Sequence, residues 1–169
     1  MILHVLALLA ISTGVLAAQQ VGREASISEF PQLPRDMAQD LNMRGCTVPQ
    51  PPALRKLTSV IQGHFRDPWQ MDWAVLCDSR AKGTSMLLVY WNGDPSQLAV
   101  VTKSKLQNNS CWTEIAPVGK ALIVEHYRAY GGPKPPTIDH QGINIGICEK
   151  ASTVAYFYRK QWLTLTGSD

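Results

Sequence analysis

Several features that would assign a function are missing from this chain of 169 residues. It has no Gly-x-Ser-x-Gly element, the strained turn on which α/β-hydrolases carry their nucleophile. No two cysteines have the two-residue spacing of structural zinc sites and thioredoxin-like motifs. The basic residues are scattered and form no dense stripe, so we expect no nucleic-acid partner. These absences exclude the commonest signatures of nucleophilic catalysis, zinc binding and phosphate-backbone recognition.

Charge is absent from the N-terminal 18 residues, which contain no Asp, Glu, Lys or Arg. Their apolar core is shorter than the roughly 20 apolar residues of a membrane-spanning helix and matches the hydrophobic region of a secretory signal peptide. We predict a signal peptide at residues 1–17, cleaved after Ala17 or, as the second choice, after Ala18. No later run reaches membrane length, so we expect no membrane span after cleavage. The mature protein is then periplasmic or extracellular.

The four cysteines support export, because an even number of them suits an oxidising compartment. They are Cys46, Cys77, Cys111 and Cys148. Sequence alone allows three pairings. We predict the sequential one, Cys46 with Cys77 and Cys111 with Cys148, and each bridge would close a loop of about 30 residues that contributes roughly 3–4 kcal/mol.

One helix is indicated near the start of the mature chain. Residues 18–32 are polar and lack a hydrophobic period, which predicts a mobile leader. Leu33, Met37 and Leu41 then recur at helical spacing and make one apolar stripe. Pro34 suits a first turn, and Gly45 is a natural stop. We therefore predict a helix over 34–44 at the start of a single β-rich domain, residues 33–169.

The rest of the chain predicts strands separated by turns every 10 to 15 residues. The strand at 73–77 is apolar on both faces, which is typical of a central strand. Turns are indicated at 92–96, at 117–119 and at Arg159-Lys160, and a long irregular loop at 131–136. The predicted strands cover 58–62, 73–77, 85–91, 98–102, 112–115, 120–127, 143–147, 153–158 and 161–165. The fold class that follows is mainly β (α+β): an antiparallel sheet, sandwich or open barrel with one N-terminal helix.

Residues 63–75 resemble the loop-and-strand unit of integrin-type (FG-GAP/VCBS) propeller repeats. The matching residues are Gly63, Phe65, Asp72, Ala74 and Val75. The calcium loop of that family is not reproduced, since calcium takes 6–8 oxygen ligands and the loop here is poor in carboxylates. The unit also does not repeat, and a closed propeller has at least four blades. The resemblance therefore implies a local turn into a central strand, without calcium binding.

A second resemblance covers more of the chain. The motifs are Gly-Cys-Thr-Val-Pro-Gln at 45–50, Asp-Trp-Ala-Val-Leu-Cys at 72–77 and Tyr-Phe-Tyr at 156–158. Together they look like an uncharacterised family of small exported bacterial proteins. The resemblance implies export and a single domain, and it transfers no catalytic residue.

Aromatic side chains crowd the second half of the chain and suggest a binding surface. Tyr and Trp are favoured at interfaces because they bury much area with few rotatable bonds. On an alternating strand, Tyr156 and Tyr158 share one face and Phe157 takes the other. With the irregular loop nearby, these aromatics could rim a protein or glycan site; the alternative is core packing. The candidate surface comprises Tyr130, Tyr156, Tyr158, Trp162, Asp139 and His140.

Acid–histidine pairs occur at Glu125-His126 and Asp139-His140. Adjacent residues on a strand face opposite ways, so the first pair is not expected to cooperate in the predicted strand. Asp139 and His140, with Glu149 and His64, offer suitable metal ligands, but no ligand-spacing motif supports a metal or other cofactor site.

The leading functional hypothesis is a non-catalytic exported binding or inhibitor-like domain whose partner is a protein or glycan of the cell envelope. The alternatives are a metal-assisted hydrolase using the Asp139/His140 region and a structural cell-envelope accessory protein.

Overall fold

The computed structural model describes residues 23–50, 59–106, 113–147 and 151–167. The predicted signal peptide, Cys111, Cys148 and Glu149 lie outside the described residues. The helices within them are α1 (Arg35–Met43), α2 (Lys120–Tyr130) and three short 3-10 helices, η1 (Ile27–Glu29), η2 (Trp91–Gly93) and η3 (Pro95–Gln97). The strands are β1 (Arg23–Ala25), β2 (Val48–Gln50), β3 (Val60–Gly63), β4 (Asp72–Ser79), β5 (Thr84–Tyr90), β6 (Leu98–Lys105), β7 (Thr113–Val118), β8 (Gly142–Ile147), β9 (Ala151–Tyr158) and β10 (Gln161–Thr166).

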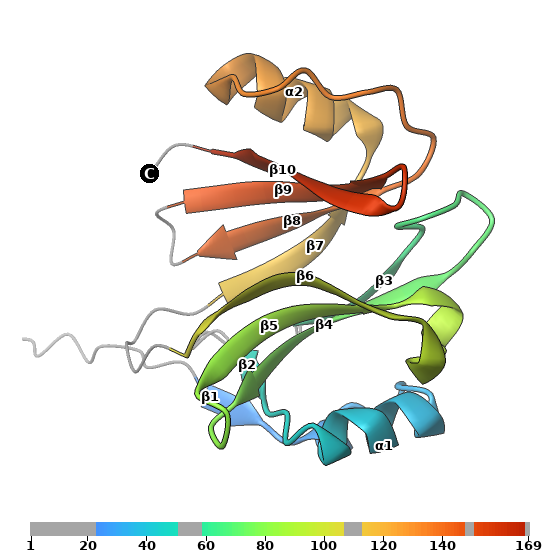
Figure 1. The fold of residues 1–169 in the computed structure, drawn as a ribbon, viewed down its shortest axis with the longest axis vertical. Coiled ribbons are helices and arrows are strands. Elements are labelled where there is room, and N and C mark those ends of the chain that lie inside the picture. Colours follow the sequence, from blue (N-terminus) through green and yellow to red (C-terminus); the bar gives the residue numbers. More distant parts are fainter. Residues whose placement is uncertain (1–22, 51–58, 107–112, 148–150, 168–169) are drawn as a thin grey trace, which may run out of the picture.

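The described residues form two open, four-stranded antiparallel sheets and a small two-stranded pair. One sheet has the order β3-β4-β5-β6, the other β10-β9-β8-β7, and β1 pairs with β2. Figure 1 shows α2 across the outer face of the β7–β10 sheet and α1 on the far side of the β3–β6 sheet. The mainly β, antiparallel fold predicted from the sequence is confirmed, and the two sheets stack as layers between the two helices.

Three apolar clusters fill the spaces between these layers. Along β4, Val75 packs toward α1, whereas Ala74 and Leu76 pack between the two sheets. A third cluster lies under α2 and includes Ile123 and Tyr156. Strand β4 is therefore covered on both faces, as its unbroken apolar run predicts. Each fully buried aliphatic or aromatic side chain contributes about 1.5–3 kcal/mol relative to exposure.

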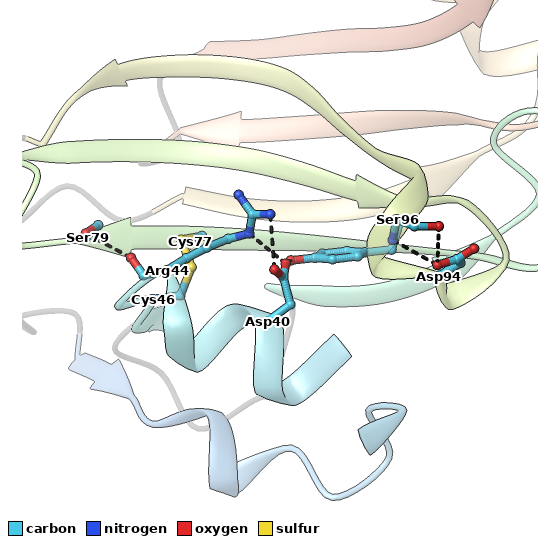
Figure 2. Close-up of polar contacts among 8 residues, drawn as sticks. Asp40, Arg44, Cys46, Cys77, Ser79, Asp94 and Ser96 are labelled. Carbon is cyan, nitrogen blue, oxygen red and sulfur yellow. Dashed lines mark hydrogen bonds and ion pairs between the residues drawn. A yellow bond between two sulfur atoms is a disulfide. The ribbon is translucent and has the colours of Figure 1, made fainter. Parts of the chain in front are cut away.

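Helix α1 is held on the β3–β6 sheet by apolar, polar and covalent contacts. Met37 and Leu41 are fully buried against the sheet, as the helical spacing predicts. Figure 2 shows Arg44 donating to the Asp40 carboxylate at the helix end, with a shortest separation of 2.6 Å. The predicted Cys46–Cys77 disulfide is present and joins the segment after α1 to β4.

The segment expected to be a mobile leader is an ordered part of the fold from residue 23 onward. Strand β1 pairs with β2, and Ala25, Ile27 and Phe30 are buried in the cluster beneath α1. The prediction is wrong for residues 23–32, and residues 18–22 lie outside the described part. The segment changes from a strand to a 3-10 helix within a few residues, so its buried side chains follow no single period.

A strand was also expected at 120–127, and this prediction is wrong because the segment is part of helix α2. The buried side chains of α2 are Ile123 and His126, three residues apart on one helical face. The helix ends before Gly131, whose φ of +78° suits glycine. The fold thus has a second helix beyond the predicted N-terminal one. No helix of the described residues is long and apolar enough to cross a membrane.

The predicted turns at 92–96 and 159–160 are confirmed. Asp94 accepts hydrogen bonds from the backbone N–H and hydroxyl of Ser96, both at 2.8 Å, which closes the first turn (Figure 2). Arg159 and Lys160 have φ angles of +48° and +67°, and they join β9 to β10. Two consecutive positive φ values match the right-handed twist of a tight hairpin.

Candidate binding loop

The loop between β3 and β4, residues 64–71, is organised by a buried carboxylate. Asp72 has no exposed surface. One carboxylate oxygen accepts from the backbone N–H groups of Phe65 and Arg66 at 3.1 and 3.2 Å. The other accepts from the backbone N–H of Asn92 at 2.9 Å and from the Gln70 side chain. Because four donors converge on one buried charge, the loop backbone is tied to β4 and to the turn after β5.

Further hydrogen bonds hold the loop, some of them within the loop and two of them to Gln141. The His64 imidazole Nδ1 lies 2.8 Å from the Gln70 carbonyl oxygen. The Gln141 side chain accepts from the His64 backbone N–H at 2.8 Å, and the Gln141 N–H donates to the His64 carbonyl at 2.7 Å. At the tip, the Asp67 carboxylate accepts from the Trp69 N–H at 2.9 Å. The backbone of the loop is therefore fixed by hydrogen bonds at several points along its length.

Trp69 projects from this restrained loop with 90% of its surface exposed. Met71, two residues further along, is 44% exposed. Below the tip, the Arg66 guanidinium lies 5.6 Å above the centroid of the buried Trp91 ring, a cation–π contact with the layer between the sheets. An exposed indole on a backbone that loses little freedom on binding is the combination that gives protein interfaces their strongest contacts.

Both acidic residues of this segment, Asp67 and Asp72, accept hydrogen bonds. Asp72 opens the central strand β4. Its carboxylate oxygens receive N–H donors, and an oxygen of Asp67 is likewise occupied by the Trp69 N–H. The loop is thus closed by hydrogen bonds to these two carboxylates.

The aromatic residues proposed from the sequence divide among three environments. Tyr156 is 1% exposed and belongs to the core under α2, so its side chain is not available to a surface partner. Tyr158 packs half-buried at the same layer, as the predicted alternation requires. Trp162 stacks between the sheets against Trp91, with ring centroids 5.8 Å apart. Of the four aromatics in the candidate surface, Tyr130 is the exposed one, at 50%.

The predicted Asp139/His140 region lies beside the binding loop through Gln141. Asp139 is exposed, and the Nδ1 atom of His140 lies 3.0 Å from the Gln141 carbonyl oxygen. The backbone of His64 is bonded to the same glutamine. Across the described ranges, no three His, Cys, Asp or Glu side chains gather in a way that could hold a metal ion.

Trp69 was missed as a site residue, and His126 was missed as a helix residue. Trp69 sits in Asp-Pro-Trp-Gln, where a proline and polar neighbours place an aromatic in a turn. The sequence therefore indicates a turn at Trp69, but only the fold shows whether the Trp69 side chain is exposed or packed in the core. His126 was assigned to a strand, and the helical spacing of Ile123, His126, Tyr127 and Tyr130 is the pattern that could have corrected this.

The motifs at 45–50, 72–77 and 156–158 each contribute buried residues to the fold. Cys46 is bonded to Cys77, and both Asp72 and Tyr156 are buried. These residues therefore lie in the interior of the fold and not at the exposed tip of the loop. In comparisons with known proteins, no family model, no curated protein and no solved structure matches this chain.

Proposed function

We propose that this protein is an exported, non-catalytic binding domain that engages a protein of the cell envelope through loop 64–71. The observation that carries the proposal is the 90% exposure of Trp69 on a loop anchored by the buried Asp72 carboxylate. Exposing a large apolar side chain on a restrained backbone is unfavourable in isolation, and insertion into a partner would reverse that cost.

A protruding side chain favours a protein over a small ligand as the partner. Trp69 and Met71 form an apolar tip, and the neighbouring Arg66 and Asp67 side chains are exposed and of opposite charge. An apolar centre with a polar rim is the arrangement of protein interfaces, in which an aromatic anchor of one partner fills a pocket of the other. An inhibitor-like mode, with the loop inserted into a cleft, is the form of binding that this shape supports best.

The Cys46–Cys77 disulfide supports the exported location. Disulfides persist in oxidising compartments and are rare in the cytosol. A protein held by such a bridge is suited to the periplasm or the cell exterior, where the predicted signal peptide would deliver it.

The test is an affinity pull-down from crosslinked cell-envelope extract of the source organism, using the oxidised protein with a C-terminal tag. Trp69→Ala is compared with Met43→Ala, because Met43 is also an exposed apolar residue, at 73%, but lies at the end of α1. Both changes are at the surface and should alter the free energy of unfolding by about 0.5 kcal/mol or less.

We expect one protein to be recovered in near-equal amount with the wild type and with Met43→Ala, and to be lost with Trp69→Ala. Recovery of the same partner by folded Trp69→Ala would contradict the assignment of the loop. Absence of any enriched partner from the wild-type pull-down would contradict the proposed function as a whole.

A further inference from the structure

The tip of loop 64–71 is a restrained turn at the edge of the molecule. The Gln70 N–H donates to the Asp67 carbonyl oxygen at 3.2 Å, and the Asp67 carboxylate accepts from the Trp69 N–H at 2.9 Å. Pro68, at the second position of this turn, has a φ angle fixed by its own ring. Figure 1 shows the connection between β3 and β4 projecting beyond the ends of the strands that it joins. The tip is therefore open to a second molecule.

The apolar part of the tip consists of Trp69 and Met71. Trp69 is exposed over nearly its whole surface, and Met71 over almost half of it. In a free monomer water surrounds the indole on nearly all sides, and contact with another apolar surface would remove this cost. The apolar part of the tip therefore favours association with a second apolar surface.

Two charges of opposite sign border this apolar part. Arg66 and Asp67 are adjacent in sequence and exposed, and neither belongs to a salt bridge among the described residues. The Arg66 guanidinium is held 5.6 Å from the centroid of the Trp91 ring, and the Asp67 carboxylate is held by the Trp69 N–H. Both charges are thus restrained beside the apolar tip and are available to a partner.

A surface of this composition is complementary to a copy of itself. In a contact with twofold symmetry, a residue of one copy that meets a second residue of the other is matched by the reverse contact. Arg66 of each copy then faces Asp67 of the other, while Trp69 and Met71 pack at the centre. A partner surface with charge of one sign would instead place a like charge against either Arg66 or Asp67.

The area of the tip sets the strength of such a contact. Two indoles and two half-exposed methionine side chains would bury on the order of 600 Å² in total, at about 150–250 Å² for each aromatic side chain. Stable interfaces bury about 1,200–2,000 Å², so this contact belongs to the weak class. We propose that two copies of the protein form a weak, transient dimer through their tips, with Trp69 and Met71 at the centre and reciprocal Arg66–Asp67 ion pairs at the rim.

The experiment is a dilution series of the oxidised protein, followed by NMR at the Trp69 indole N–H and by sedimentation equilibrium. The chain has five tryptophans, and the signal that is missing from the spectrum of Trp69→Ala identifies Trp69. We expect the Trp69 signal to shift with protein concentration and to give a dimer Kd of about 0.1–1 mM. The mass from sedimentation should reach that of two copies and no more.

Single variants separate the apolar and the charged parts of the contact. Trp69→Ala should weaken the dimer at least about tenfold. Met43→Ala is its control and should leave the dimer unchanged, because Met43 is exposed at the end of α1. Arg66→Glu should weaken the dimer as strongly as Trp69→Ala, since the introduced carboxylate faces Asp67 of the other copy. Arg66→Gln also loses the contact with Trp91 but adds no like charge, so it should weaken the dimer less.

A mixture of two variants tests the reciprocity of the ion pairs. Arg66→Glu has two acidic groups at the tip and Asp67→Lys has two basic ones, so neither should dimerise alone. An equimolar mixture restores both ion pairs and should associate with the wild-type Kd to within about tenfold. If Asp67→Lys loosens the turn, the comparison of Arg66→Glu with Arg66→Gln still decides whether the charges pair.

The proposal is overturned if the wild-type Trp69 signal does not change up to about 2 mM protein, or if particles larger than two copies form. It is also overturned if Trp69→Ala dimerises as the wild type does, or if Arg66→Glu and Arg66→Gln associate equally. A partner on the tip would exclude the second copy; that competition rests on the proposed function, and the dimer does not. An envelope partner without a dimer contradicts this inference alone, and a dimer without an envelope partner contradicts the proposed function alone.

Discussion

The Tyr90 hydroxyl on β5 donates a hydrogen bond of 2.8 Å to the Asp40 carboxylate on α1. Burial raises the pKa of the Tyr90 phenol, and the neighbouring carboxylate raises it further, so the hydroxyl remains a donor across the accessible pH range. Burial by itself would raise the pKa of Asp40, but the hydrogen bonds from Arg44 and Tyr90 outweigh the effect of burial. The pKa of Asp40 is therefore lowered from its ordinary value. The helix is thus joined to the sheet by a charged acceptor with two donors from different elements.

Replacing Tyr90 by Phe should lower the free energy of unfolding by about 1.5–3 kcal/mol, because the lost hydrogen bond has a charged acceptor. The ring remains and keeps its packing in the cluster under α1. Urea unfolding at neutral pH measures the change, and Tyr158→Phe is the control because Tyr158 lies outside this network. Equal stabilities of the two variants would show that the Tyr90–Asp40 bond contributes nothing.

Asp78 should make stability fall as the pH rises. Burial raises its pKa above the ordinary value of 3.8, and the nearby Glu24 adds to this, while Ser85 and Arg80 oppose it. One carboxylate oxygen is buried without a hydrogen-bond partner among the described residues. A carboxyl group with a raised folded-state pKa binds more protons in the folded state, so stability is lost as the pH rises from the unfolded-state pKa through the folded-state pKa.

Asp78→Asn should therefore raise the melting temperature at pH 7 and have little effect below pH 3.8, where both states of the wild type are protonated. Thermal unfolding at a series of pH values measures the difference between variant and wild type. A gain that is constant with pH, or a loss at pH 7, would contradict the prediction.

The Cys46–Cys77 bridge should contribute about 3–4 kcal/mol, since it closes a loop between residues 31 apart in sequence. The variant with Cys111→Ala and Cys148→Ala keeps this bridge as the only one available. Its denaturant unfolding is compared with and without reductant. The variant with Cys46→Ala and Cys77→Ala lacks this bridge, and the same comparison on it is the matched control. Superimposable curves for the oxidised and reduced forms would disprove a stabilising role.

Asp72→Asn should destabilise the protein by about 3 kcal/mol and loosen loop 64–71. Each carboxylate oxygen accepts from two donors, so an amide NH₂ in either position faces N–H groups and leaves them unpaired. Asp67→Asn is the control, because its remaining amide oxygen can still accept from the Trp69 N–H.

Hydrogen exchange at Phe65 and Arg66, together with urea unfolding, measures the effect of Asp72→Asn. Faster exchange at these amides in Asp72→Asn than in Asp67→Asn is expected. Unchanged protection would mean that the buried carboxylate does not restrain the loop.

Local patterns in the sequence were sufficient for several parts of this protein. The spacing of Met37 and Leu41 specifies α1, because one helical face collects its apolar residues without reference to the rest of the chain. The apolar run of β4 specifies a strand covered on both faces. Of the two predicted disulfides, Cys46–Cys77 is confirmed, and the other lies outside the described residues.

The tertiary structure alone decided which side chains are exposed. Tyr156 is buried because α2 covers its face of the β7–β10 sheet. The sequence did not indicate this helix, because its residues also suit strands. Trp69 is exposed on a loop whose backbone is fixed by Asp72 and Gln141, and these contacts join residues as far apart in sequence as His64 and Gln141. The sequence by itself determined the helix α1, the central strand and the antiparallel sheets, whose signals are periodic and short-range. The exposure of the binding loop and the position of α2 depend on which layer covers which face, and long-range packing determines that.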